Sequence, residues 1–368
     1  MDVERVLVVN AGSSSLKLRV LGGDDDVVAD HDVERWDREP DHADAGDFIR
    51  SLDRVDAIGH RVVHGGSRFV SPVRIDDEVV AAIDELTPLA PLHQPRAVAG
   101  ITLTRKLLPD VPAVACFDTA FHSTLPPEAA TYALPKAWNE RFGLRRFGFH
   151  GLSHAWVAGR APEILRKPAA DLRLVSAHLG AGASLCAIAG GKSVATTMGF
   201  TPLEGLVMAT RSGDVDPGLV LWLQQQGGVS ADELAGTLET DSGLAGLSGT
   251  SGDMRDVLAA VDAGDADAHL AYGVWLHRLR AAVAAMAAAM GGVDALAFTG
   301  GIGEHAARAR ADACAGLEFL GLGLGVDASV NARTTSDGLI AERVLVVTAR
   351  EDRQIASEVR AVVGGGAN

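Results

Sequence analysis

The sequence stretch VLVVNAGSSSLKLRV, residues 6–20, decides the fold. The apolar run 6–9 predicts a buried strand, and the alternation of apolar and polar residues over 16–20 predicts a second strand with one solvated face. The intervening NAGSSS contains a glycine, which permits a tight turn, and serines whose hydroxyls and amides can surround an anion. The stretch therefore predicts a phosphate-binding β-loop-β unit that uses Ser13, Ser15 and Lys17, with an ordinary polar hairpin turn as the alternative.

Length and composition predict a soluble globular protein. A chain of 368 residues favours two domains over one large domain. The apolar fraction of 47% and the charged fraction of 22% are ordinary for such proteins. A formal net charge of −15 argues against nucleic acid as a partner, although a locally basic site can still bind an anionic substrate.

Cysteine usage and the absence of targeting patterns indicate the compartment. Cys116, Cys186 and Cys314 are widely spaced and odd in number, which predicts reduced thiols and neither a disulfide framework nor a zinc site. The first residues lack the features of a signal or transit peptide, and the weakly apolar run 281–293 is too short to span a bilayer. We therefore expect a cytoplasmic protein that binds no membrane.

The rest of the chain alternates predicted strands and helices, as in α/β proteins. Apolar runs predict strands at 111–117, 172–177, 294–298 and 343–347, and helical periodicity or composition predicts helices at 76–86, 266–290 and 351–363. The acidic segment 22–56 predicts a variable surface region with at most one short helix.

Two charged residues stand near predicted strand ends, where ligands bind in open α/β sheets. Asp118 follows the strand 111–117 and is either a site residue or a helix N-cap. Arg61 precedes an apolar pair and a glycine loop, where it can bind a carboxylate through two hydrogen bonds or form a structural ion pair. His60 and His64 are four residues apart, but the strand-like context argues against a metal site.

Glycine-rich segments in the second half suggest a nucleotide site. The stretch HLGAGASL, 178–185, echoes the first hairpin, which suggests two related halves or a chance similarity between glycine-rich hairpins. Glycines also follow the strand 294–298, just before a helix N-terminus. Arg211, among glycines and carboxylates, is either a transition-state clamp or the partner of Asp214 in a capped turn. Neither a P-loop nor a dinucleotide-binding motif is present.

Nine stretches in this order resemble the acetate kinase family, which belongs to the acetate and sugar kinase, Hsp70 and actin superfamily. They run from the first hairpin to the glycines after the strand 294–298, and together they are highly specific. The matching stretches are NAGSSSLK, HRVVHGG, LAPLHQP, FDTAFH, FGFHGLSH, HLGAGAS, MGFTPLEGL, TRSGDVDPG and FTGGIGE.

The resemblance implies an α/β fold with two RNase H-like domains flanking a central cleft, and a homodimer. The implied boundaries are 1–117 with the C-terminal helix 353–368 for the first domain and 118–352 for the second. It also implies reversible, Mg²⁺-dependent transfer of the ATP γ-phosphoryl group directly to acetate, giving acetyl phosphate and ADP, with Mn²⁺ as a possible substitute for Mg²⁺.

The resemblance also implies roles for individual residues. Asp118, His150 and Arg211 match catalytic positions, and Asn10 and Glu351 match magnesium positions, with Asp352 as the alternative to Glu351. The matching acetate-binding positions are Arg61, Val63, Leu92, His93, Phe149 and Pro202. The matching nucleotide-binding positions are His178, Leu179, Gly180, Ala181, Gly182, Asp253, Met254, Arg255, Gly301, Ile302, Gly303, Glu304 and His305.

This chain departs from the family pattern at the nucleotide loops and before Glu351. Ala181, Ala183, Met254 and His305 replace residues usual in the family, as does the tripeptide 348–350. The alternatives to an acetate kinase are a propionate or butyrate kinase and, from another class, a non-catalytic actin-like nucleotide switch.

Overall fold

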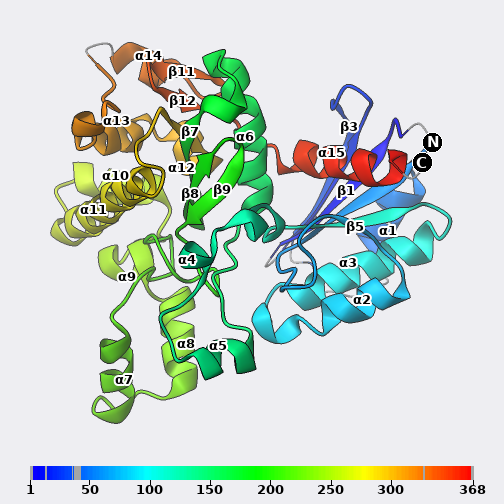
Figure 1. Cartoon of the computed structure of the whole chain (residues 1–368), viewed down its shortest axis with the longest axis horizontal. Coiled ribbons are helices and arrows are strands. Elements are labelled where there is room, and N and C mark those ends of the chain that lie inside the picture. The colour runs from blue at the N-terminus through cyan, green and yellow to red at the C-terminus, as the bar shows by residue number, and fades with distance from the viewer. Residues whose placement is uncertain (1–2, 13–14, 35, 37–42, 326–327, 366–368) are drawn as a thin grey trace. The chain divides into compact units, whose positions relative to one another are not determined.

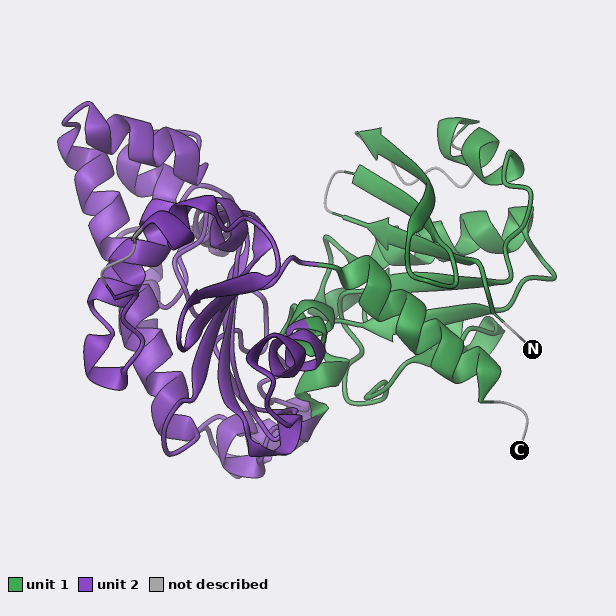
Figure 2. Ribbon diagram, turned by 90° about the horizontal axis from the view of Figure 1, so that it is seen from above, with its two compact units in different colours: residues 1–123, 149–156, 350–368 green, residues 124–148, 157–349 purple. Residues whose placement is uncertain are grey.

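The computed structural model describes residues 3–12, 15–34, 36, 43–325 and 328–365. Contacts divide the chain into two compact units (Figure 2). Unit 1 comprises Met1–Ser123, Phe149–Trp156 and Arg350–Asn368, and unit 2 comprises Thr124–Gly148 and Val157–Ala349. The domain boundaries inferred from the family resemblance remain a prediction.

Unit 1 contains a six-stranded sheet in the order β3-β2-β1-β4-β6-β5 (Figure 1). The strands are β1 (Val6–Ala11), β2 (Ser15–Leu21), β3 (Val27–Glu34), β4 (Ala57–Val62), β5 (Val73–Arg74) and β6 (Ala113–Phe117). The first three form an antiparallel meander, β4 and β6 continue the sheet in parallel with β1, and β5 closes the edge antiparallel to β6. The hairpin predicted over residues 6–20 is therefore confirmed.

Helices cover both faces of this sheet. The helices α1 (Ala43–Arg50), α2 (Asp77–Asp84) and α3 (Gln94–Leu107) pack on one face, and α15 (Glu351–Gly364) packs on the other. Burial on both sides explains why β1 begins with four consecutive apolar residues. The short 3-10 helices η1 (Thr87–Leu89) and η2 (Ala120–Thr124) lie in connections, and η2 ends at the first residue of unit 2.

Unit 2 repeats the same sheet topology. Its order, β9-β8-β7-β10-β12-β11, matches that of unit 1 strand for strand, including the antiparallel meander, the two parallel strands and the antiparallel edge strand. The strands are β7 (Arg173–Leu179), β8 (Ala183–Ala189), β9 (Lys192–Thr196), β10 (Ala295–Thr299), β11 (Gly338–Ala341) and β12 (Val344–Val346). The two related halves and the α/β fold with two RNase H-like sheets are thus confirmed.

The remaining helices belong to unit 2, except that α6 begins in unit 1. The α-helices are α4 (Pro127–Ala130), α5 (Lys136–Phe142), α6 (Gly151–Leu165), α7 (Pro217–Gln225), α8 (Ala231–Thr240), α9 (Gly243–Ser248), α10 (Met254–Asp262), α11 (Ala266–Ala289), α12 (Gly300–His305), α13 (Ala307–Ala315) and α14 (Ala328–Arg333). The 3-10 helices are η3 (Ala169–Asp171) and η4 (Glu318–Leu320). No helix in the described residues is both long and apolar enough to cross a membrane.

The segment 22–56 contains more structure than its composition indicates. It holds β3, which pairs along its whole length with β2, and the helix α1 lies within its described part. Strand β3 lies at a sheet edge, carries acidic residues at alternate positions over 30–34, and has mostly exposed side chains. The segment is thus a surface region with a short helix, as predicted, but the sequence did not reveal β3, because an edge strand needs little apolar sequence.

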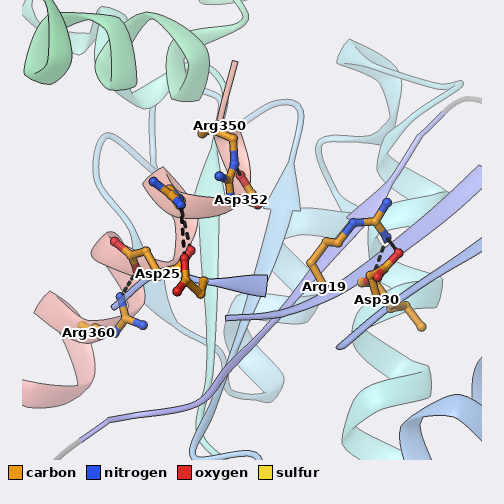
Figure 3. A network of polar contacts seen from close by, with 9 residues as sticks. Arg19, Asp25, Asp30, Arg350, Asp352 and Arg360 are labelled. Carbon is orange, nitrogen blue, oxygen red and sulfur yellow. Dashed lines mark hydrogen bonds and ion pairs between the residues drawn. The ribbon is translucent and has the colours of Figure 1, made fainter. Parts of the chain in front are cut away.

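Helix α15 is fastened to the sheet by apolar packing and by charge. A Cβ atom on Gly59 in β4 would lie 2.4 Å from Ile355 and 2.8 Å from Val359, so the glycine allows α15 to approach closely. Along the helix, Arg360 bonds the Asp25 carboxylate and the Gly22 carbonyl in the turn between β2 and β3 (Figure 3). These contacts determine where the first residue of α15 lies.

We expect the Gly59→Val variant to be less stable by about 1–3 kcal/mol, because the added side chain overpacks the interface with α15. Urea unfolding followed by circular dichroism measures the change. Gly159→Ala is the control, because a Cβ added to this exposed glycine of α6 would meet no atom within 4 Å, and alanine favours the helix. Equal stability of the Gly59→Val variant and the wild type would contradict the role assigned to Gly59.

Candidate active site

The carboxyl ends of the three parallel strands in unit 1 carry polar residues on a single face. Asn10 lies in β1, Arg61 in β4, and Asp118 directly after β6. In each strand the residue two positions earlier belongs to the surface against α15, namely Val8, Gly59 and Cys116. Because side chains alternate along a strand, the three polar residues point to that same face.

Arg61 joins these residues into one polar cluster. Its Nε and Nη2 donate to the two oxygens of Asp118 at 3.0 and 2.6 Å, and its Nη1 donates to the Asn10 oxygen at 3.2 Å. Burial opposes the charge of Arg61, but Asp118 and Glu351 raise the pKa of its guanidinium. Burial also raises the pKa of Asp118, yet both of its oxygens accept from Arg61, which keeps it a carboxylate at neutral pH.

The two acidic residues at the start of α15 have different partners. Glu351 lies 3.8 Å from the Arg61 Nε, whereas Asp352 forms two 2.8 Å bonds with Arg350 (Figure 3). Asn10 and Glu351 therefore place two oxygen donors beside Arg61, and hard oxygen donors of this kind suit Mg²⁺. Both oxygens of Asp118 already accept from Arg61, so Asp118 adds no further donor. In the described part of the chain, no group of three His, Cys, Asp or Glu side chains could hold a metal ion.

The FGFHG segment is bonded to the end of β6. The Gly151 N–H donates to the Asp118 carbonyl at 2.8 Å, and a Cβ on Gly151 would lie 2.1 Å from that oxygen. The neighbouring His150 has a φ of 56°, a left-handed conformation that costs energy for a non-glycine residue. Such strain is typical of functional sites, and here the contact between Gly151 and Asp118 holds it.

The predicted acetate-binding residues other than Arg61 occupy varied environments. Val63 and Phe149 are buried, with exposed fractions of 8% and 1%, whereas Leu92 is 55% exposed. His93 is half-buried immediately before α3, and Pro202 belongs to unit 2. The apolar pocket for the acetate methyl group remains a prediction.

The predicted phosphate loop in unit 1 is described only in part. Ser13 lies outside the described residues. Ser15 is the first residue of β2, and its carbonyl accepts from the Gly12 N–H at 2.8 Å. Lys17 is exposed and opposite Asn10 in the hairpin, so its cationic side chain belongs to the same end of β1 as the Arg61 cluster.

Unit 2 contains a pocket of about 920 Å³, a size suited to a nucleotide. Its wall includes eight of the predicted nucleotide residues, namely Gly180, Ala181, Asp253, Met254, Arg255, Gly301, Ile302 and His305. The predicted residues His178, Leu179, Gly182, Gly303 and Glu304 do not line it. The pocket-lining residues that were not predicted from the sequence are Ala209, Ser251, Gly252, Asp256, Leu258, Ala306, Ala307 and Arg308. Of these, only Ser251, Gly252 and Asp256 could have been found from the sequence, because they belong to a polar, glycine-containing loop that leads into a helix.

Glycines bring the walls of this pocket together. Gly300 has a φ of 77°, and a Cβ there would lie 2.8 Å from the Leu179 carbonyl at the end of β7. Gly252 has a φ of 79°, and its Cβ would lie 2.4 Å from the Ala209 carbonyl. A side chain at either position would collide with the neighbouring carbonyl and force the loops apart. L-residues also avoid a positive φ, which is a second reason for glycine at both positions.

A buried arginine supports one wall. Arg310 of α13 is 1% exposed and donates to the carbonyls of Gly303 and Glu304 at 2.8 and 2.6 Å. It also donates to the side chain of Asn331 at 2.8 Å and to its carbonyl at 2.7 Å. Burial lowers the pKa of Arg310, and these carbonyl acceptors compensate for the lost solvation. Gly303 and Glu304 therefore support the wall from behind without lining the pocket.

A second wall of the pocket contains the start of helix α10, where Asp253 is the N-cap. Asp253 accepts from the Arg255 backbone N–H at 2.9 Å at the start of α10, and from the Arg255 guanidinium at 3.0 and 2.7 Å. These hydrogen bonds lower the pKa of Asp253 to about 2, so the residue is charged at neutral pH.

Arg211 lies in a loop that is anchored on both sides. The Met208 N–H donates to the Arg211 carbonyl at 3.1 Å, and the Ser212 N–H donates to Leu238 in α8 at 3.0 Å. Gly243, at the start of α9, has a φ of 63°, and a Cβ there would lie 2.7 Å from the Arg211 carbonyl. Neighbouring helices therefore bind the backbone of this loop on both sides of Arg211.

The guanidinium of Arg211 forms no ion pair in the described part of the chain, although the Glu239 carboxylate interacts with it electrostatically. Its Nη1 donates to the Pro202 carbonyl at 3.3 Å and to the Met208 sulfur at 3.8 Å. Burial lowers the pKa of Arg211, and Glu239 opposes that shift. Asp214, the partner considered from the sequence, instead accepts from the Gly205 N–H at 2.8 Å.

Comparison with known proteins identifies the family. A model of the acetokinase family matches residues 41–357. The chain belongs to the acetokinase family. An acetate kinase of Synechococcus sp. (strain JA-2-3B'a(2-13)) is 50% identical over 327 residues, which cover 87% of this chain and 80% of that protein. A propionate kinase of Citrobacter rodentium is 43% identical over 389 residues, 96% of each chain. The crystal structure of Porphyromonas gingivalis acetate kinase has a TM-score of 0.90 and 38% identity, and the match covers 98% of this chain and 100% of that one.

In this member of the acetokinase family, we expect Asp118→Asn to lower the free energy of unfolding by about 3 kcal/mol, because the partly buried Arg61 charge loses its closest counter-ion and keeps only Glu351, at 3.8 Å. Chemical denaturation measures this loss. The double variant Arg61→Met/Asp118→Leu removes both charges and should recover a large part of the stability. If the double variant is no more stable than Asp118→Asn, the loss does not arise from an unpaired charge.

Proposed function

We propose that this protein is an acetate kinase, which transfers the γ-phosphoryl group of ATP reversibly and directly to acetate, giving acetyl phosphate and ADP. The observation that best supports this proposal is the contrast between Arg61 and Arg211. Arg61 is held rigidly by Asp118, as a carboxylate-binding residue requires, whereas Arg211 forms no ion pair among the described residues. Membership of the acetokinase family and the pocket in unit 2 support the same activity.

Each residue has a role that phosphoryl transfer requires. Arg61 binds the acetate carboxylate and aligns its oxygen, and Asp118 orients Arg61 and organises the charge around it. His150 and Arg211 stabilise the negative charge on the transferred group. Acetate is ionised at neutral pH, so the reaction needs no general base.

The metal ion belongs to the proposal as well. Bound Mg²⁺ neutralises charge on the phosphate oxygens, with Asn10 and Glu351 as protein ligands, and Mn²⁺ can replace it. Asp352 is the weaker candidate, since Arg350 already occupies both of its oxygens. We also propose that the enzyme works in the cytoplasm, where its buried cysteines Cys116, Cys186 and Cys314 stay reduced.

One assay separates this function from a nucleotide switch. The protein is incubated with Mg-ATP, acetate and hydroxylamine, and acetohydroxamate is expected, because only an acyl kinase makes the acyl phosphate that hydroxylamine traps. Parallel reactions with pyrophosphate identify the phosphoryl donor, and ATP should give the higher activity. Absence of hydroxamate with acetate, propionate and butyrate would overturn the proposal.

Arg211→Ala should lower kcat by roughly two to three orders of magnitude, the usual effect of losing one electrostatic donor to the transition state. Steady-state kinetics with acetate and ATP measures it, and the exposed Arg54→Ala serves as the control. An unchanged kcat with a raised KM for acetate would mean that Arg211 contributes to binding alone.

Acetate should be preferred over propionate, and propionate over butyrate. Each added methylene offers about 0.8 kcal/mol of burial, but overpacking a closed pocket costs about 1–3 kcal/mol. We expect about a tenfold loss in kcat/KM for propionate and a larger one for butyrate. Val63→Ala should narrow the gap by making room, whereas the exposed Val70→Ala should not. A butyrate kcat/KM at or above that for acetate would make this enzyme a butyrate kinase.

We further propose a homodimer that buries helix α7. Five of the nine residues of α7 are aliphatic or aromatic, but none is buried within the chain. Leu219, Leu221 and Trp222 are 49%, 53% and 56% exposed. A second copy would remove this apolar surface from water.

The Trp222→Glu variant should therefore be monomeric, because a carboxylate in an apolar interface is costly to bury. Light scattering coupled to size-exclusion chromatography measures the mass. Phe319→Glu, a similar change at another exposed aromatic residue of unit 2, should leave the dimer intact. A wild-type protein that is monomeric at all concentrations would exclude the homodimer.

A further inference from the structure

Beneath the loop that contacts Arg211, a tyrosine, a glutamate and an arginine form a connected cluster. We propose that Tyr132 and Glu204 are positioning residues, which fix the loop 199–205 so that its Pro202 carbonyl holds the Arg211 guanidinium in place. The inference rests on the proposed role of Arg211. Neither residue was singled out by the sequence reasoning.

Glu204 is the centre of the cluster. One carboxylate oxygen accepts from the Tyr132 hydroxyl at 2.6 Å, and the other pairs with the Arg146 guanidinium. Both oxygens of Glu204 are therefore used inside the protein, which makes the residue a structural anion and no ligand for substrate. The same Arg146 donates to the carbonyls of Thr197 and Met198 at 3.0 Å each, so it also grips the chain leading into the loop.

The Tyr132 hydroxyl is used twice. It donates to Glu204 and accepts from the Phe200 backbone N–H at 2.8 Å. Burial and the neighbouring Glu204 raise the pKa of Tyr132, so its hydroxyl keeps the proton that it donates. Removing this one oxygen would leave an N–H of the loop and an oxygen of Glu204 without their partner.

The backbone of the loop packs directly against this cluster. A Cβ on Gly199 would lie 1.6 Å from a Glu204 oxygen and 2.3 Å from the Tyr132 hydroxyl, so the backbone rests directly on the two side chains. The Gly199 carbonyl also accepts from the N–H groups of Phe147 and Gly148 at 3.0 and 3.1 Å. A shift of the Tyr132–Glu204 pair must therefore move the loop.

The loop in turn contacts the segment that bears Arg211. The Arg211 Nη1 donates to the Pro202 carbonyl at 3.3 Å. Gly205 and Asp214 exchange two hydrogen bonds, from the Gly205 N–H to the Asp214 carboxylate at 2.8 Å and from the Asp214 N–H to the Gly205 carbonyl at 3.0 Å. The loop and the Arg211 segment are thus bonded at two places, which transmits its position to the guanidinium.

The test is a double-mutant cycle on kcat between Tyr132→Phe and Arg211→Ala. In the wild-type background, Tyr132→Phe should lower kcat about tenfold, while the Kd for Mg-ADP and the Tm stay near their wild-type values. In the Arg211→Ala background the same change should cost little, because the group that it positions is gone. Tyr272→Phe is the matched control, since that hydroxyl bonds Asp312 at 2.7 Å and makes no contact with the loop 199–205.

Two variants of Glu204 test the other member of the positioning pair. Glu204→Gln keeps the shape but weakens both bonds, so it should reproduce the loss in kcat, and Glu204→Asp should not restore it, because the shorter side chain cannot reach both partners. An unchanged kcat in Tyr132→Phe, or an equal loss in both backgrounds, would overturn the positioning role. An unchanged kcat in Arg211→Ala itself would instead overturn the proposed role of Arg211.

Discussion

The ion pair between the partly buried Arg61 and the buried Asp118 is the interaction on which the arrangement of unit 1 depends. Removing two charges from water costs several kcal/mol per ion, and only good geometry offsets that cost. The geometry requires β1, β4 and β6 to end in register and α15 to place Glu351 beside them. The packing of α15 on Gly59 and the charged contacts of its far end therefore serve the same cluster.

The same sheet topology supports two kinds of chemistry. In unit 1 the ends of the parallel strands carry side chains, namely Asn10, Arg61 and Asp118. In unit 2 the ends of β7 and β10 lead into glycine-rich turns that line a pocket, so the backbone forms much of its wall. In the function that we propose, unit 1 would recognise a small carboxylate by charges in fixed positions, and unit 2 would offer the roomy surface that a nucleotide needs.

The arginines of the chain illustrate how burial and partner determine a role. Arg61 has a carboxylate partner, Arg310 has carbonyl and amide acceptors, and Arg211 has one carbonyl and no ion pair in the described residues. The paired Arg61 is fixed in place by Asp118, and Arg310 supports the backbone whose carbonyls it binds. Arg211, which has no ion pair among the described residues, is the one for which we propose a role on the transferred group.

The sequence by itself determined the α/β class, the first hairpin and the family, because apolar periodicity and ordered motifs are local properties of the chain. It only suggested the repeated halves, which the matching strand orders of the two sheets then showed. It also identified Arg61, Asp118 and Arg211, but left open whether each is paired or available. Only the tertiary structure decided that Arg61 bonds Asp118, that Arg211 does not bond Asp214, and that Tyr132 supports the loop next to Arg211. Tyr132 and Glu204 are 72 residues apart, and no local pattern reports a contact over such a separation. Strand β3 was not predicted for a related reason: it is stabilised by its pairing with β2, which its own composition does not indicate.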